Sequence, residues 1–337
     1  MAVVSANTSQ SYNIGDKRVY SSASDESKID LRDVITMISP DDTPYQSNIG
    51  SEDCQNTIFE WLEDSLAATS TTADLEADTT TRAAISHATR QSNICQINSR
   101  NASVSGTAQA ISMHGKPEGD MAYQITKRTK ELKRSVEAVL LSNQARNNGA
   151  SGTARTTASL LSWLHTNTSF STSGTTNGAD PVSPGGTGSN GVRTDASTDG
   201  LRALSSTLIN DVMTSAYQNG GLPDMLMVGP VNKVKIASLT GRTSARDVIE
   251  PNVAGLGSIT VFATPFGDLD VHCNLFQRER DALLIEKQYH KVRFLRNYES
   301  TELGIVGDEN TRSVRAEYGL EVTAEASSGA VFDLTIT

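Results

Sequence analysis

The longest periodic segment of the chain reads EGDMAYQITKRTKELKRSVEAVLLSNQARNN, residues 118–148. Its apolar residues recur at helical spacing, Glu118 and Asp120 suit a first helical turn, and Asn148 followed by Gly149 suits a helix end. At 1.5 Å per residue such a helix is about 45 Å long, against a mean of about 11 to 12 residues in globular proteins. We therefore predict a spine helix over residues 118–148. Its apolar side holds Met121, Ile125, Leu132, Val136, Val139 and Leu140, and its basic flank holds Lys127, Arg128, Lys130, Lys133 and Arg134.

The region before this helix has the alternating pattern of β-strands. The segment TIFEWL, residues 57–62, alternates apolar and polar residues, and NICQINSRNASVSGTAQAI, residues 93–111, has β-type spacing. A Thr-rich stretch, TSTTADLEADTTTR, lies between them. We predict a long two-stranded excursion here, and because an isolated hairpin is marginally stable in water, we expect it to need support from elsewhere.

Two polar regions have little periodicity. Residues 1–50 contain one helical candidate, from Lys28 to Ile38, and are predicted to form an arm. Residues 149–198 contain the apolar island ASLLSWL and then TNTSFSTSGTTNGADPVSPGGTGSNG. On composition this second region is predicted to be a mobile loop.

The remainder of the chain has an α/β pattern followed by strands. A helix is predicted from Leu201 to Ala216, then a buried strand at MLMVG, a helix from Pro230, a hairpin around PFGD and a strand at ALLIE. Alternating apolar residues at 314–322 and 330–336 predict half-buried strands at the end of the chain.

Composition excludes several classes of protein. With 337 residues, 37% of them hydrophobic and 20% charged, the chain is typical of soluble globular proteins. The net charge of −10 argues against tight, sequence-independent DNA binding, which depends on Lys and Arg. No signal peptide or membrane span is apparent. The three cysteines are widely spaced and indicate neither a disulfide framework nor a zinc site, so a reducing cytoplasm is expected.

No catalytic constellation stands out. The motifs GxSxG, HExxH, the P-loop and the EF-hand loop do not occur. GTGSNG, residues 186–191, matches GxGxxG but follows PVSPG instead of a predicted strand, so we interpret it as loop. The five histidines are scattered, and the carboxylate pairs Asp41-Asp42 and Glu63-Asp64 are interpreted as solvated or capping residues. We therefore expect no enzyme activity, no cofactor and no metal site.

Charge is unevenly distributed along the chain. Residues 51–81 contain eight acidic residues and neither Lys nor Arg, whereas the spine helix carries the basic flank. These segments are either two solvated faces or complementary surfaces, the acidic hairpin of one subunit lying across the basic helix of its neighbour. In the second case, charge reversal at Lys130 and Arg134 should impair assembly and leave the subunit folded. The candidate contact residues are Phe59, Glu60, Trp61, Glu63 and Asp64 on the hairpin and Lys127, Lys130 and Arg134 on the helix.

Taken in order, these elements resemble the major capsid proteins of tailed bacteriophages, of the Hong Kong 97 type. ISPDDTPYQSNIG followed by TIFEWLEDSL is similar to the entry into the extended loop in that family. GGLPDMLMVGPVNKVKIASLTGR is similar to the core of the axial domain, and RAEYGLEV to the last peripheral-domain strand. The resemblance implies an α+β fold. Its expected parts are an N-terminal arm over 1–50, an extended loop over 51–115, a peripheral domain with spine helix and Ser/Gly-rich loop over 116–198, an axial domain over 199–300, and returning peripheral strands over 301–337.

The resemblance also implies a function. It implies self-assembly into hexamers and pentamers that enclose phage DNA without binding it specifically, in a virion assembled in the host cytoplasm. The extended loop would overlie an adjacent subunit, which would partly bury Phe59 and Trp61. The Hong Kong 97 capsid, after which this type is named, has a covalent cross-link that needs a lysine in this loop. Since no lysine occurs between Lys28 and Lys116, a non-covalent shell is expected here. Portal, scaffolding and decoration proteins are further candidate partners.

Two other classes remain open from the residues alone. A tail or surface-layer subunit would form open filaments or flat sheets instead of closed shells. A hydrolase with a site built from dispersed residues would be a compact monomer with a deep polar pocket.

Overall fold

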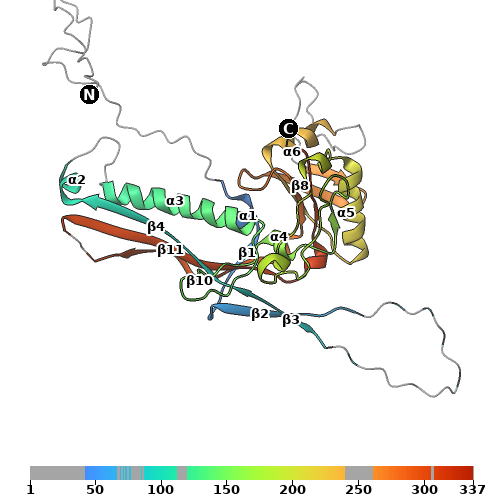
Figure 1. Cartoon of the computed structure of the whole chain (residues 1–337), viewed down its shortest axis with the longest axis horizontal. Coiled ribbons are helices and arrows are strands. Elements are labelled where there is room, and N and C mark those ends of the chain that lie inside the picture. The colour runs from blue at the N-terminus through green and yellow to red at the C-terminus, as the bar shows by residue number, and fades with distance from the viewer. Residues whose placement is uncertain are drawn as a thin grey trace, which may run out of the picture.

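The computed structural model describes residues 42–66, 69, 71, 73, 76, 85, 87–111, 120–239, 261–304 and 307–336. The helix expected from Lys28 to Ile38 lies outside these residues. In Figure 1 a long helix lies along a sheet of long strands, a two-stranded hairpin leaves the sheet on the other side, and a compact α/β unit occupies one end.

A four-stranded sheet forms the elongated part of the molecule. Its order is β1 (Gly50–Asp53), β10 (His290–Glu302), β11 (Glu309–Val322) and β4 (Gln96–Ser105). β1 is parallel to β10, and the other two pairs are antiparallel. The apolar residues of β11 that the sequence alternation singled out are buried, so this predicted strand is confirmed. A short helix, α1 (Pro44–Asn48), precedes β1, and another, α2 (Gly106–Ala110), follows β4.

The spine helix, α3 (Asp120–Leu140), packs across β4 and β11 and buries Leu132, Val136 and Leu140. The predicted end at Asn148 is wrong. The helix stops at Leu140, so it is about 31 Å long. The following residues bond outside the helix instead of continuing it: Gln144 N–H donates to Ser159 Oγ, and the backbones of residues 147 and 156 bond to each other. These contacts satisfy the backbone groups that a longer helix would have used.

A six-stranded sheet forms the core of the α/β unit. Its order is β5 (Thr168–Ser169), β12 (Gly329–Val331), β9 (Ala282–Ile285), β6 (Met225–Val228), β8 (Gly267–Cys273) and β7 (Val261–Thr264). The helices α5 (Ser206–Gln218) and α6 (Pro230–Ser238) belong to this unit. α5 begins where the Ser205 hydroxyl accepts from Leu208 N–H, and it ends before Gly220, whose φ of 86° favours glycine.

The expected boundary between residues 300 and 301 falls inside a single strand. β10 starts at His290 and belongs to the four-stranded sheet, although it begins within the expected axial domain over residues 199–300. Conversely, β12 was expected among the peripheral strands but joins the six-stranded sheet between β5 and β9. β4 likewise pairs with β11, so only β2 (Ile58–Glu63) and β3 (Thr89–Ile94) form the two-stranded hairpin.

Residues 149–198 are packed against the chain's own core, so the expectation of a mobile loop is wrong. α4 (Leu160–Trp163) is buried throughout. Asp333, near the end of the chain, accepts from the backbone N–H groups of Ser171 and Ala196. Glu325 accepts from His165 N–H and Thr166 N–H in the same way. Short 3-10 turns complete the unit: η1 (Gly188–Gly191), η2 (Thr198–Gly200), η3 (Lys287–Tyr289) and η4 (Glu325–Ser327).

Candidate functional site

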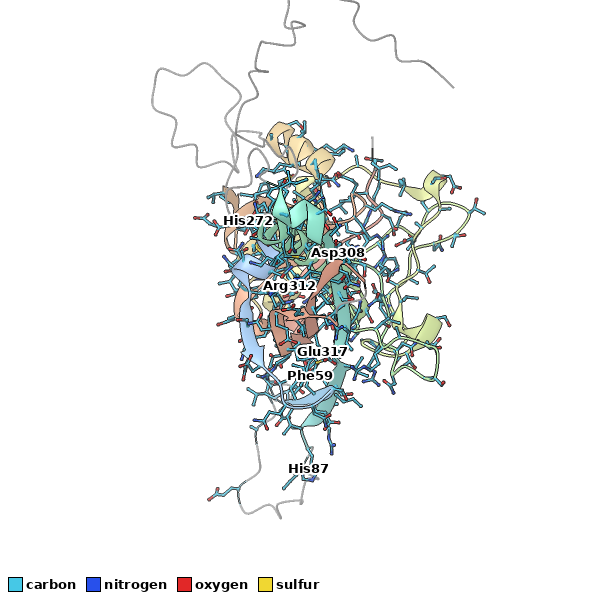
Figure 2. All side chains as sticks on the ribbon, turned by 90° about the vertical axis from the view of Figure 1, so that its left-hand side faces the viewer. Phe59, His87, His272, Asp308, Arg312 and Glu317 are labelled. Atoms are coloured by element: carbon cyan, nitrogen blue, oxygen red, sulfur yellow. The ribbon has the colours of Figure 1, made fainter. Side chains whose placement is uncertain are left out.

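The inner face of the β2–β3 hairpin packs on the chain's own body. Strand alternation places Phe59 and Trp61 on this face, and each is only 8% exposed. The ring centroid of Trp61 lies 5.2 Å from that of Trp163, and the ring of Phe59 lies against Gly319, where a Cβ would come within 2.5 Å of it. The expectation that a neighbouring subunit buries these two rings is therefore wrong. Figure 2 labels Phe59 on the hairpin and Glu317 on β11.

The outer face of the hairpin, defined here as Ile58, Glu60, Leu62 and Asp64, is exposed. Ile58 is 43% and Leu62 68% exposed, so the face is apolar as well as acidic. Glu60 forms an ion pair of 3.1 Å with Arg90 on β3. Glu63 was expected among the acidic contact residues, but alternation turns it inward, where burial raises the pKa of its carboxyl.

The basic flank of α3 is partly occupied by contacts within the chain. Arg128 pairs with Glu131 at 2.7 Å, and Arg134 lies over the ring of Phe276, 5.3 Å from its centroid. Lys130 is exposed and Lys127 partly so. Figure 1 shows α3 and the hairpin apart, on different sides of the sheet. One chain therefore does not bring its acidic hairpin and its basic flank together.

Glu137 joins three parts of the molecule. It is fully buried on α3, and its carboxylate accepts from the backbone N–H of Tyr45 at 2.7 Å and of Gln46 at 3.0 Å. The side-chain amide of Asn274, just after β8, also donates to it at 2.7 Å. Residue spacing does not single out Glu137, although an acidic side chain next to Val136 on the apolar side of the helix is visible in the sequence. Burial raises the pKa of Glu137.

A cluster of charged residues around the buried Arg193 fixes residues 149–198 to the end of the chain. Arg193 is fully buried, 3.1 Å from Asp180 and 3.6 Å from Asp333, and its guanidinium lies 3.5 Å from the ring centroid of Phe332. Burial raises the pKa of Asp281, which pairs with Arg278 at 3.3 Å, to about 7. No local pattern marked these residues, because they come from separate segments. The full cluster comprises Asp180, Arg193, Asp195, Arg278, Arg280, Asp281 and Asp333.

His290 is buried where β10 begins. Its Nδ1 lies 3.0 Å from Tyr45 Oη and its Nε2 2.9 Å from Ser328 Oγ. Burial disfavours the charged ring and lowers the pKa of His290 to about 4. The side chain therefore acts as a neutral link between α1, β10 and the segment before β12.

This low pKa predicts a specific loss of stability in acid. The unfolded chain binds a proton at His290 near pH 6.5 and the folded chain only near pH 4, so stability rises with pH across that window and falls as acid is added. Between pH 7 and pH 4.5 the contribution is about 2 kcal/mol. Asparagine cannot titrate. We therefore expect the free energy of unfolding, measured in urea, to fall by about 2 kcal/mol less between pH 7 and pH 4.5 in His290→Asn than in the unsubstituted chain. Equal losses would contradict the assignment.

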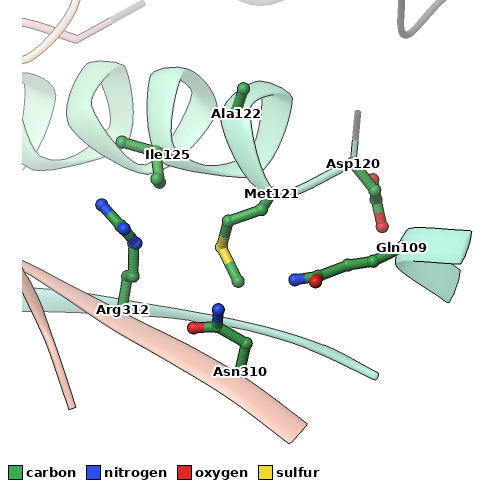
Figure 3. A pocket seen from close by; sticks show the side chains of 7 residues that line it. All are labelled: Gln109, Asp120, Met121, Ala122, Ile125, Asn310 and Arg312. Atoms are coloured by element: carbon green, nitrogen blue, oxygen red, sulfur yellow. The ribbon is translucent and has the colours of Figure 1, made fainter. Parts of the chain in front are cut away.

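The open cleft in Figure 3 does not resemble a catalytic site. It lies between α2, the first turns of α3 and the start of β11 and has a volume of about 460 Å³. Among the described residues that line it there is neither a Ser, Cys or Lys nucleophile nor a histidine. Its lining consists of Gln109, Asp120, Met121, Ala122, Ile125, Asn310 and Arg312.

Within the described part of the chain, no group of three or more His, Cys, Asp or Glu residues is placed to hold a metal ion. Among the described helices, none has the length and hydropathy needed to cross a membrane. The GTGSNG stretch ends in the turn η1 and not in a helix that could face a pyrophosphate.

Comparison with known proteins points to one class. The family model described as SU10 major capsid protein matches residues 5–335. A major capsid protein of Escherichia phage Phieco32 is 35% identical over 120 residues, which cover 35% of this chain and 34% of that protein, about a third of its length.

Solved capsid structures share the fold at low sequence identity. A capsid chain of a native GTA particle superposes with a TM-score of 0.62 and 11% identity, covering 94% of this chain and 100% of that one. A chain of Gordonia phage Cozz gives 0.57 at 9% identity, with 91% of each chain covered. A chain from the structure of the major capsid and decoration proteins of phage G gives 0.53 at 12% identity, covering 94% of this chain and 100% of that one.

Proposed function

This chain belongs to the SU10 major capsid protein family, whose model matches residues 5–335, and we propose that its copies assemble into hexamers and pentamers that close an icosahedral head around phage DNA. Its fold is the α+β fold of Hong Kong 97-type capsid proteins. As a major capsid protein it is part of the virion. The family match carries the proposal. Assembly in the host cytoplasm and a purely structural, non-enzymatic role belong to the proposal as well.

The net negative charge of the chain supports a shell protein that does not bind the packaged DNA tightly. With a net charge of −10, the protein as a whole repels the phosphate backbone, so packaged DNA is enclosed without specific binding. The absence of lysine between Lys28 and Lys116 supports a shell held by non-covalent contacts. Portal, scaffolding and decoration proteins are further proposed partners of this chain. No observation favours a tail subunit, a sheet-forming subunit or a hydrolase.

The outer face of the hairpin is the proposed contact with a neighbouring subunit. Ile58 and Leu62 offer apolar area, and Glu60 and Asp64 offer negative charge. The basic flank of α3, with Lys127 and Lys130, is the proposed complement on the neighbour. Complementary charge of this kind fixes register more than it adds affinity.

Electron microscopy of the purified full chain, after a gradient that separates assemblies from free subunits, tests the proposed function. Closed shells or rings of five and six subunits are expected. Open tubes or flat sheets would favour a tail or surface-layer subunit. A chain that stays monomeric at high concentration, with and without a scaffold from the same phage, would contradict self-assembly.

A charge swap tests the proposed contact. We expect Lys127→Glu with Lys130→Glu to reduce assembly at least tenfold, because the reversed flank then repels the acidic hairpin by several kcal/mol. Arg134 is left unchanged, since it packs over Phe276 within its own chain. Adding Asp64→Lys to the same chain should restore assembly in part, and Glu60 is left unchanged because it pairs with Arg90 within its own hairpin. If the first pair assembles normally, or if the swap does not rescue it, the two surfaces do not meet.

A further inference from the structure

Two of the three cysteines, which are far apart in the sequence, lie together at the base of the hairpin. The Sγ atoms of Cys54 and Cys95 are 3.4 Å apart. Cys54 follows β1, and its backbone N–H donates to Phe294 on β10. Cys95 lies between β3 and β4, and its backbone N–H donates to Thr57 at the start of β2. The pair therefore stands where the chain leaves the body to form the hairpin and where it returns.

We propose that Cys54 and Cys95 form a disulfide that closes the base of the hairpin when the protein meets an oxidising medium. Both residues are free thiols in the structure. A disulfide has an S–S length of about 2.05 Å, so the two sulfurs need to approach by about 1.4 Å from their 3.4 Å separation. Both backbones are already held by hydrogen bonds, so this approach requires side-chain rotation and a small local shift.

The surroundings of the two thiols define the order of the reaction. Cys54 is partly exposed and Cys95 is fully buried, so an oxidant from solution meets Cys54 first. With a small disulfide such as oxidised glutathione, the Cys54 thiolate attacks one sulfur and releases one glutathione thiolate. The Cys95 thiolate then attacks the Cys54 sulfur, forms the Cys54–Cys95 bond and releases the second glutathione. The protons of the two cysteines end on the two glutathione thiols, so two thiols are oxidised and one disulfide is reduced.

The reaction should be slow in a reducing cell and faster at alkaline pH. Burial raises the pKa of both thiols, that of Cys95 more strongly, so little thiolate is present near neutral pH. A reducing cytoplasm keeps such thiols free, whereas an extracellular medium does not. If the chain forms a phage head, as proposed above, the bond would close after release of the particle and tie together both ends of each extended loop.

Thiol counting on the full chain tests the bond itself. Cys273 lies at the end of β8 in the other sheet and is exposed, so Cys273→Ser provides a parent with two thiols. After incubation with oxidised glutathione at pH 8, the parent is expected to lose both thiols and two hydrogens of mass without retaining glutathione. A peptide that joins Cys54 to Cys95 should appear without reductant and vanish with it. Oxidised protein should also melt several degrees higher than reduced protein.

Two further variants separate the roles of the thiols. Cys95→Ser in the Cys273→Ser parent should stop as a mixed disulfide of Cys54 with glutathione. Cys54→Ser in the same parent should keep its buried Cys95 free until urea is added. The proposal is overturned if the folded parent keeps both thiols, or stops at one glutathione adduct, under conditions that oxidise it in urea.

The failure of this inference is distinguishable from the failure of the proposed function. Electron microscopy of the same samples reports assembly, and thiol counting reports the bond. Particles without the bond overturn only the disulfide, and the bond without particles overturns only the capsid assembly.

Discussion

Glu137→Ala is expected to lower the free energy of unfolding by about 3 kcal/mol. The substitution leaves the buried backbone N–H of Tyr45 without an acceptor, and it leaves the side-chain amide of Asn274 with only the sulfur of Met227 at 3.4 Å. An orphaned buried donor costs about 1–3 kcal/mol, and removal of a buried carboxylate returns part of that sum. Because these donors belong to α1 and to the segment after β8, the loss also loosens the contact of both with the spine helix. Urea unfolding measures the effect, and we expect the slope of the free energy against urea concentration to stay unchanged.

A matched control lies on the same helix. Glu131 is partly exposed and pairs with Arg128 across one helical turn. Glu131→Ala should cost no more than about 0.5 kcal/mol. Glu137→Gln retains one acceptor oxygen and should fall between the two. A loss below about 1 kcal/mol for Glu137→Ala would show that the three parts are not held together at this carboxylate.

Arg193→Ala is expected to lower the free energy of unfolding by about 3–5 kcal/mol at pH 8. The guanidinium has no exposed surface and stands between the partly exposed Asp180 and the buried Asp333. Its removal leaves Asp333 with Arg280 as its remaining ion-pair partner among the described residues. It also removes the contact with the ring of Phe332. Residues 149–198 then lose their main electrostatic tie to the end of the chain, and protease sites within them should become accessible.

The same variant should respond to pH in a defined direction. In the folded chain the pKa of Asp281 is raised from 3.8 to about 7, so folded protein binds more protons than unfolded protein between these values and stability falls as pH rises. Without Arg193 the raised pKa moves further up, because one attractive charge is gone. We therefore expect Arg193→Ala to lower the free energy of unfolding less at pH 5.5 than at pH 8, as measured by urea unfolding at both pH values. A loss independent of pH would assign the effect to packing alone.

Arg312 provides the control for a charge outside the cluster. It pairs with Glu302 at 3.2 Å, with side chains that are 36% and 51% exposed, and Arg312→Ala should cost about 0.2–1 kcal/mol. Arg193→Lys keeps a positive charge but cannot span the same carboxylates, so it should recover only part of the loss. If Arg193→Lys kept the full stability of the unsubstituted chain, positive charge alone would suffice and the forked shape of the guanidinium would not be needed for stability.

Much of the fold could be predicted because its signals are local. The spine helix, the strand at 314–322, the α5 helix and the buried strand at MLMVG each carry their own periodicity or caps. Such patterns depend on a few neighbouring residues, and no distant contact is needed to produce them. Their order along the chain was enough to suggest the capsid family, which the family match then confirmed.

Where local signals ended, long-range contacts decided the outcome. Residues 142–148 fall within the predicted helix but bond to residues 156–159 instead. The Gly/Ser-rich segment is ordered by Asp333 and Glu325 from the other end of the chain. The hairpin rings of Phe59 and Trp61 find Gly319 and Trp163 within their own subunit. No spacing in the sequence could show the partners of these two rings, because Trp163 is about a hundred residues from Trp61 and Gly319 is 260 residues from Phe59.

The sequence by itself determined the strongly periodic helices and strands, the acidic balance of the chain and the family, since each of these depends on composition or on neighbouring residues. Only the tertiary structure decided which side chains lose their contact with water. Burial of Glu137, Arg193 and His290, and the approach of Cys54 to Cys95, follow from the packing of remote segments. Desolvation and proximity set the pKa values and the reactivity of these groups, and both are properties of the folded arrangement and not of the local sequence.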